Sequence, residues 1–70
     1  MRAQMRLTVN GEDRVFEPIS TVFALIEALG LDARKLASER NLELVPRSAY
    51  DQTPLCEGDR IEIVHFIGGG

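Results

Sequence analysis

The sequence closes with GDRIEIVHFIGGG (residues 58–70), in which a turn signal, a strand-forming run and three glycines follow one another. Glycine and aspartate favour turns, and the β-branched, alternating run after them predicts a strand from Arg60 to about Ile67. Successive side chains of a strand point to opposite faces of its sheet. The two faces are Ile61, Ile63, His65 and Ile67 on one side, and Arg60, Glu62, Val64 and Phe66 on the other.

The second of these faces is a candidate partner surface. If the isoleucines of the other face lie under a helix, Val64 and Phe66 stand on the outer side of the sheet. Exposed apolar patches commonly mark partner surfaces. We therefore expect Glu62, Val64 and Phe66 to form an interface, the alternative being that a loop or the N-terminal segment covers the two apolar side chains.

The beginning of the chain predicts a β-hairpin. In MRLTVN (residues 5–10) apolar and polar residues alternate, which is the pattern of a half-buried strand. Asn and Gly accept positive φ, so the NGED that follows predicts a turn at residues 10–13. RVFEPI then predicts the return strand, which Pro18 either ends or follows at a sheet edge. The sequence leaves open whether Val15 or Phe16 faces the core, because that depends on the register of the loop.

The stretch STVFALIEALG (residues 20–30) predicts an amphipathic helix. Ser20 or Thr21 can cap its start, and Gly30 follows its last turn. Its apolar residues recur at i, i+3, i+4 and i+7 and so share one face of a helix. They are Val22, Leu25, Ile26 and Leu29.

Two short strands are predicted between this helix and the final strand, at residues 36–40 and 42–45, before Pro46 breaks the pattern. A hairpin, one helix and three further strands predict an α+β fold in which one mixed sheet wraps over a single helix. The first and last strands should be neighbours at its centre. We expect one domain over residues 1–70, with residues 1–4 as a possible disordered extension.

The composition restricts the classes of function. A chain of 70 residues buries only about 60% of its unfolded surface, too little for a large enzyme cleft. The net charge of −3, without a clustered basic face, argues against nucleic acid and anionic membrane as partners. The N-terminus holds no apolar run of signal-peptide length and no window approaches a membrane span, so we expect a cytoplasmic protein.

The three glycines at the end predict a tail with a chemical role. Gly68, Gly69 and Gly70 have no Cβ, so an extended, flexible tail of them enters a slot that excludes side chains. The carboxylate at its end is ionised at neutral pH and is a poor electrophile. An enzyme that transfers AMP from ATP would activate it for attack by a sulfur nucleophile. The domain would then be a substrate and carrier, whereas the alternative is a frayed terminus or a cloning remnant.

In the order of its elements and in its motifs, the chain resembles the ubiquitin-like β-grasp sulfur carriers, and in detail the ThiS family of thiamine thiazole synthesis. Relatives usually have an apolar residue where Ser38 stands, which predicts a locally weaker strand. The residues that carry the resemblance are LTVNGE (7–12), Thr21 with the helix at 25–29, ERN (39–41) with Glu43 and Val45–Arg47, and LCEGDRIEIVHFIGGG (55–70).

The resemblance implies a role for the last residue. A ThiF-type, E1-like enzyme would adenylate the Gly70 carboxylate with ATP, and sulfur drawn from a cysteine desulfurase would convert it to a thiocarboxylate. The thiazole synthase ThiG would then receive the sulfur. By the same resemblance the chain is not an enzyme and binds no cofactor of its own. Two rivals stay open, a sulfur carrier for molybdopterin synthesis and a ubiquitin-like protein modifier, as does a plain interaction module.

Few side chains are candidates for chemistry. Cys56 and His65 provide no metal-site spacing, and one cysteine excludes an internal disulfide. We expect no persulfide on Cys56, because it lies among acidic neighbours, and no catalysis by His65, which has no partner nucleophile in the pattern. The acidic group Glu57, Asp59 and Glu62 is either a solvated face or a feature that steers a basic docking surface.

Overall fold

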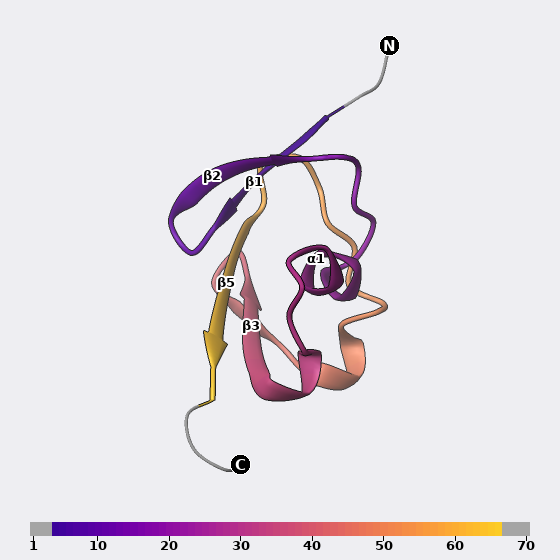
Figure 1. Cartoon of the computed structure of the whole chain (residues 1–70), viewed down its shortest axis with the longest axis vertical. Helices are drawn as coiled ribbons and strands as arrows, with labels where there is room; N and C mark the ends of the chain where they lie inside the picture. Colours follow the sequence, from indigo (N-terminus) through magenta and orange to yellow (C-terminus); the bar gives the residue numbers. More distant parts are fainter. Residues whose placement is uncertain (1–3, 67–70) are drawn as a thin grey trace.

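The computed structural model describes residues 4–66 (Figure 1). Residues 1–3 and 67–70 lie outside the described part of the chain. The elements in chain order are β1 (Met5–Val9), β2 (Glu12–Phe16), α1 (Val22–Ala28), the 3-10 turn η1 (Ala33–Lys35), β3 (Leu36–Arg40), β4 (Glu43–Val45), the 3-10 turn η2 (Arg47–Ala49) and β5 (Arg60–His65).

The five strands form one mixed sheet in the order β2-β1-β5-β3-β4. β1 and β5 are parallel neighbours, and the other three pairs are antiparallel. The sheet lies on one side of α1 (Figure 1). The predicted α+β architecture, with the first and last strands side by side and one main helix, is confirmed.

The turn between β1 and β2 settles which residue of the return strand faces inward. Asn10 and Gly11 have φ of 51° and 83°, as a two-residue type I′ turn requires. The turn is shorter than the predicted 10–13, because Glu12 already pairs with β1. With this register Phe16 packs against the core, while Val15 is 52% exposed.

The helix α1 follows the predicted pattern. Thr21 caps it, since its Oγ1 accepts a hydrogen bond from the Ala24 N–H at 3.1 Å. Gly30 follows the helix with φ of 74°, a conformation that side chains disfavour. Its predicted apolar stripe is buried except at Leu29, which is half-buried. None of the helices in residues 4–66 is long and apolar enough to cross a membrane.

The core lies between α1 and the sheet. Ile61 and Ile63 of β5 enter it at 0% and 7% exposure, as predicted. Ser38 of β3 is also fully buried, and its hydroxyl has no hydrogen-bond partner among the described residues. The remaining core residues are Leu7, Val9, Val22, Leu25, Ile26, Leu36, Val45, Tyr50 and Leu55.

Candidate functional site

The outer side of β5 carries the predicted apolar surface. Val64 is 64% exposed and Phe66 is 54% exposed, so the described chain does not cover them. Ala37 of β3 lies directly opposite Val64 in the sheet. Leu44 of β4 is 69% exposed. It shares this face, because it pairs with Glu39 of β3, which in turn lies opposite Glu62 of β5. We call Ala37, Leu44, Val64 and Phe66 the outer patch.

The outer patch adjoins a pair of carboxylates. The antiparallel register places Glu39 of β3 directly opposite Glu62 of β5, and both are half-buried. Side chains in such a position lie about 5 Å apart at Cβ, and like charges there destabilise a sheet. A cationic group docked on this face would relieve that repulsion.

The point at which the chain leaves the sheet is well defined. The Phe66 N–H donates a hydrogen bond to the Lys35 carbonyl oxygen at 2.9 Å, one residue beyond the end of β5. The predicted tail residues Gly68, Gly69 and Gly70 lie outside the described residues. Four residues of fully extended chain span at most about 14 Å, at about 3.3–3.6 Å per residue.

Asp59 does not belong to an exposed acidic group. It is 7% exposed, and its carboxylate accepts hydrogen bonds from the Cys56 N–H at 2.8 Å, Arg40 Nε at 2.9 Å and Asn41 Nδ2 at 3.1 Å. Burial alone would raise the pKa of Asp59, but these three donors outweigh it and hold the pKa below its usual value. Steering of a partner by Asp59 is therefore excluded by its burial, and its role is structural.

The same contacts join two sequence motifs. Asn41 Oδ1 accepts from the Arg60 N–H at 2.9 Å, and the Asn41 N–H donates to the Arg60 carbonyl at 2.8 Å. The ERN segment (39–41) is thus fastened to the turn before β5 and to its first residue. Sequence reasoning had noted both segments as motifs without finding this connection.

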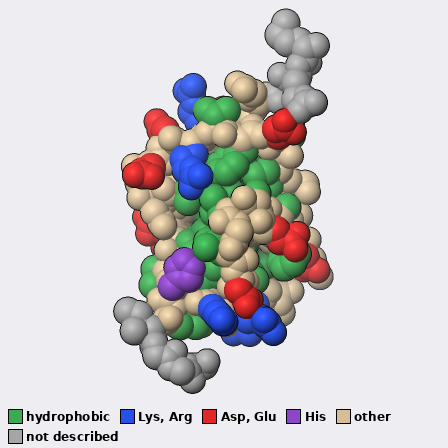
Figure 2. Space-filling model, in the orientation of Figure 1, with side chains coloured by type: hydrophobic (Ala, Val, Ile, Leu, Met, Phe, Trp, Pro, Cys, Tyr) green, Lys and Arg blue, Asp and Glu red, His purple; other side chains and the backbone are tan. Residues whose placement is uncertain are grey.

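The other candidate side chains lie apart from one another. Cys56 is exposed in the turn before β5, and His65 is exposed at the end of that strand. Within residues 4–66, no three His, Cys, Asp or Glu residues gather as a metal site would require. On the face shown in Figure 2, hydrophobic side chains occupy the middle, and charged groups of both signs lie around them.

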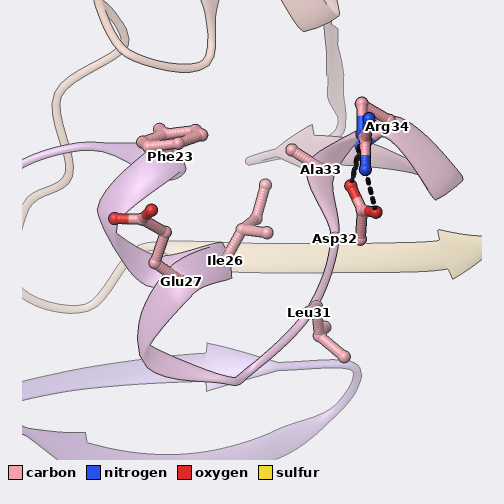
Figure 3. A pocket seen from close by; sticks show the side chains of 7 residues that line it. All are labelled: Phe23, Ile26, Glu27, Leu31, Asp32, Ala33 and Arg34. Atoms are coloured by element: carbon pink, nitrogen blue, oxygen red, sulfur yellow. Dashed lines mark hydrogen bonds and ion pairs between the residues drawn. The ribbon is translucent and has the colours of Figure 1, made fainter.

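A hollow of about 380 Å³ lies between α1 and the segment at residues 31–34 (Figure 3). Its apolar lining includes Phe23, Ile26 and Leu31. At its rim Asp32 and Arg34 form an ion pair at 3.0 Å, and the hydrogen bonds from Arg34 lower the pKa of Asp32 to about 2. No residue predicted to act in function lines this hollow.

Comparison with known proteins decides the family. The model of the ThiS family matches residues 3–70, nearly the whole chain. The chain belongs to the ThiS family. The predicted resemblance and the ubiquitin-like β-grasp fold are thereby confirmed.

Two members of the ThiS family match along most of their length. The sulfur carrier protein ThiS of Bacillus subtilis is 37% identical over 65 residues, which cover 91% of this chain and 98% of that protein. The crystal structure of the thiamine biosynthesis protein ThiS from Geobacter metallireducens superposes with a TM-score of 0.80 at 36% identity, covering 94% of this chain and all of that one.

Longer relatives carry the name thiazole synthase. That of Paramagnetospirillum magneticum is 56% identical over 66 residues, and that of Magnetococcus marinus is 44% identical over 66 residues. The match covers 94% of this chain but 20% of each of those proteins. The chain thus spans about a fifth of the length of these relatives, in which a ThiS-like segment is part of a protein named for the synthase.

Proposed function

We propose that this chain is the sulfur carrier of thiamine thiazole synthesis and that its reactive group is the carboxylate of Gly70. Membership of the ThiS family supports the carrier role most directly, together with the name of the Bacillus subtilis relative. The occurrence of a similar segment within proteins named thiazole synthase supports that enzyme as the acceptor of the sulfur.

The chemistry takes place on the main chain. A ThiF-type enzyme joins the Gly70 carboxylate to the α-phosphorus of ATP, and pyrophosphate leaves. A sulfur nucleophile, supplied by way of a cysteine desulfurase, then attacks the carbonyl carbon; a C–S bond forms and the C–O bond to AMP breaks. The product is a thiocarboxylate when the nucleophile is sulfide. When it is a protein persulfide, the product is an acyl disulfide, and a second thiol then attacks the partner's sulfur, so that a disulfide forms and the thiocarboxylate leaves. The chain is the substrate in each step, and ATP binds to the activating enzyme.

The outer patch is the proposed docking surface for these enzymes. Val64 and Phe66 are exposed, and both lie within a few residues of the reactive end. A partner that covers them holds the start of the tail, so the carboxylate needs to find its target only within the reach of four residues. Glu62, with Glu39 opposite, adds negative charge beside the patch and favours a basic surface on the partner.

The test is intact mass spectrometry after incubation of the chain with ATP, a ThiF-type enzyme and a sulfur source. We expect the mass difference of one oxygen replaced by sulfur, located at Gly70 by fragmentation. Deletion of Gly70 should abolish this gain without lowering the melting temperature. Cys56→Ser is the matched control, because it removes the chain's one thiol and should leave the gain intact.

Two outcomes would contradict the proposal. One is a wild-type chain that stays unmodified while the same enzymes load the Bacillus subtilis carrier. The other is a sulfur adduct that disappears in the Cys56→Ser variant and persists after deletion of Gly70. A protein modifier would instead give adducts with lysines of other proteins.

A further inference from the structure

β5 has a neighbouring strand on both sides for only part of its length. β3 pairs with it as far as His65, and the hydrogen bond to Lys35 extends this side to Phe66. On the other side, β1 pairs with β5 only at Arg60 and Ile61. Figure 1 shows the consequence, since β5 runs on beyond the tip of the β1–β2 hairpin.

The side chain of Asn10 ends the pairing on the β1 side. The backbone N–H of Asn10 donates to the Ile61 carbonyl oxygen at 2.9 Å, and the side-chain Oδ1 of Asn10 accepts from the Ile63 N–H at 2.7 Å. The side-chain oxygen thus stands in for the backbone carbonyl of a further strand residue. The chain cannot accompany β5 any farther, because Gly11 completes the turn into β2.

Backbone groups beyond this point face an open side. In a paired strand, the hydrogen-bonding groups of alternate residues point to opposite edges. The Ile63 N–H points toward β1 and the Phe66 N–H toward β3, so the N–H and C=O of His65 point to the side that β1 has left. The Ile63 carbonyl points the same way. We call these three groups the open edge, and none of them has a described backbone partner.

The open edge differs from the two outer edges of the sheet. β2 carries the charged residues Glu12, Asp13 and Arg14, and β4 is only three residues long. Charge and shortness are the usual means by which proteins keep sheet edges from pairing with other chains. Residues 63–66 include no Asp, Glu, Lys or Arg. This part of β5 therefore lacks the charged side chains that discourage strand addition at β2.

We propose that the open edge of β5 pairs, main chain to main chain, with an extended segment of the thiazole synthase that receives the tail. The inference rests on the proposed function, and it adds the mode of recognition. An extended peptide added to a sheet edge gains affinity from main-chain hydrogen bonds and specificity from neighbouring side-chain contacts. The thiazole synthase is the partner, because only four residues connect this edge to the carboxylate that the enzyme would receive.

Hydrogen exchange measured by NMR tests the pairing directly. In the free chain, the His65 amide should exchange at least about tenfold faster than those of Val64 and Phe66, which face β3. Addition of a purified thiazole synthase should slow His65 by about tenfold or more. If the signals of Val64 and Phe66 shift on binding while His65 exchange stays fast, the pairing is refuted. If His65 exchange instead slows as the concentration of the carrier rises, without any synthase, the edge pairs with a second copy of this chain. That result would also overturn the proposal.

Two substitutions of His65 distinguish the contribution of its backbone N–H to binding from that of its side chain. His65→Pro removes the amide N–H at an edge position, where proline is tolerated, and places a ring against the added strand. His65→Ala changes the side chain alone. We expect His65→Pro to weaken binding to the synthase by about tenfold or more, as the loss of about 1.4 kcal/mol would, and His65→Ala by less than threefold.

Equal affinities of the two folded variants would overturn the proposal. If His65→Pro lowers the melting temperature strongly, the same N–H can be removed by N-methylation of residue 65 in a chain ligated at Cys56. The proposed function fails separately. It fails if the wild-type chain gains no sulfur, whereas normal sulfur loading with equal binding of the two variants refutes the edge pairing alone.

Discussion

The buried carboxylate of Asp59 offers the sharpest test of what holds this small fold together. Asp59→Asn keeps the size and shape of the side chain but removes its charge and places an amide nitrogen where donors converge. In the structure, the carboxylate receives hydrogen bonds from Cys56, Arg40 and Asn41 at 2.8 to 3.1 Å and is 7% exposed. The asparagine can accept some of these bonds, but at least one donor must face its amide group.

The magnitude follows from these contacts. Hydrogen bonds to a charged group contribute roughly 1.5–3 kcal/mol each, and breaking a buried ion pair costs about 3–5 kcal/mol. Arg40 keeps 27% of its side chain exposed, so water compensates part of that loss. We expect Asp59→Asn to lower the free energy of unfolding by about 2–3 kcal/mol. For a domain of this size the melting temperature should fall by about 10–20 °C.

The assay is urea denaturation followed by circular dichroism, with thermal melts in parallel. Asp51→Asn, at an exposed position in a turn, is the matched control and should stay within about 0.5 kcal/mol of wild type. A double-mutant cycle with Arg40→Gln isolates the ion pair and should give a coupling of about 1 kcal/mol or more. An Asp59→Asn variant as stable as the control would refute the structural role assigned to this carboxylate.

Three further predictions concern the same framework. Ser38→Ala should raise the free energy of unfolding by about 1 kcal/mol, because it removes a buried hydroxyl that has no described partner; a fall of more than about 1 kcal/mol in urea titrations would show that the hydroxyl is satisfied. Because the pKa of Asp59 is lower in the folded chain than its unfolded value of about 3.9, its stabilisation is complete above about pH 5 and is lost as the pH falls through the folded-state pKa. As the pH falls, the free energy of unfolding of the wild-type chain should therefore decrease more steeply than that of Asp59→Asn. Parallel pH dependences of the two proteins would contradict this. Val64→Asp should weaken binding to the ThiF-type enzyme at least about tenfold with little change in melting temperature. The control Val15→Asp, at an exposed position on β2, should leave this affinity within about threefold of wild type. Equal losses of affinity in the two variants, measured by calorimetry, would argue against the outer patch.

The sequence predicted those features that depend on local pattern. The spacing of apolar residues and the Thr21 cap identified the helix, and alternation in β5 assigned Ile61 inward and Val64 outward correctly. The burial of Phe16 was undecided, because it depends on whether the hairpin turn holds two residues or more. A change of one residue in that loop exchanges the faces of the strand.

Features that arise from long-range register were not accessible in this way. The bonds of Asp59 to Arg40 and Asn41 link residues 19 and 18 positions apart, and no local pattern predicts which donors meet a given carboxylate. The open edge of β5 depends on where the parallel pairing with β1 ends, which is set by the turn at Asn10 and Gly11 and by the Asn10 side chain. Sequence identified the ERN and GDR segments as a family signature, and the structure supplies the physical reason that they occur together.

The polar contacts along β5 hold the strand from its first residue to one residue past its end. Asp59 and Asn41 hold the start of the strand, Asn10 holds its middle through Ile63, and Lys35 holds its end. An error in the direction of the strand at Phe66 would be carried over the four residues that follow, so a loosely held strand would spread the carboxylate over many positions. Fixing the strand until one residue past its end reduces the conformational entropy that an enzyme must remove to position Gly70. In the proposed function, these polar contacts position the tail, although none of their side chains takes part in the proposed chemistry.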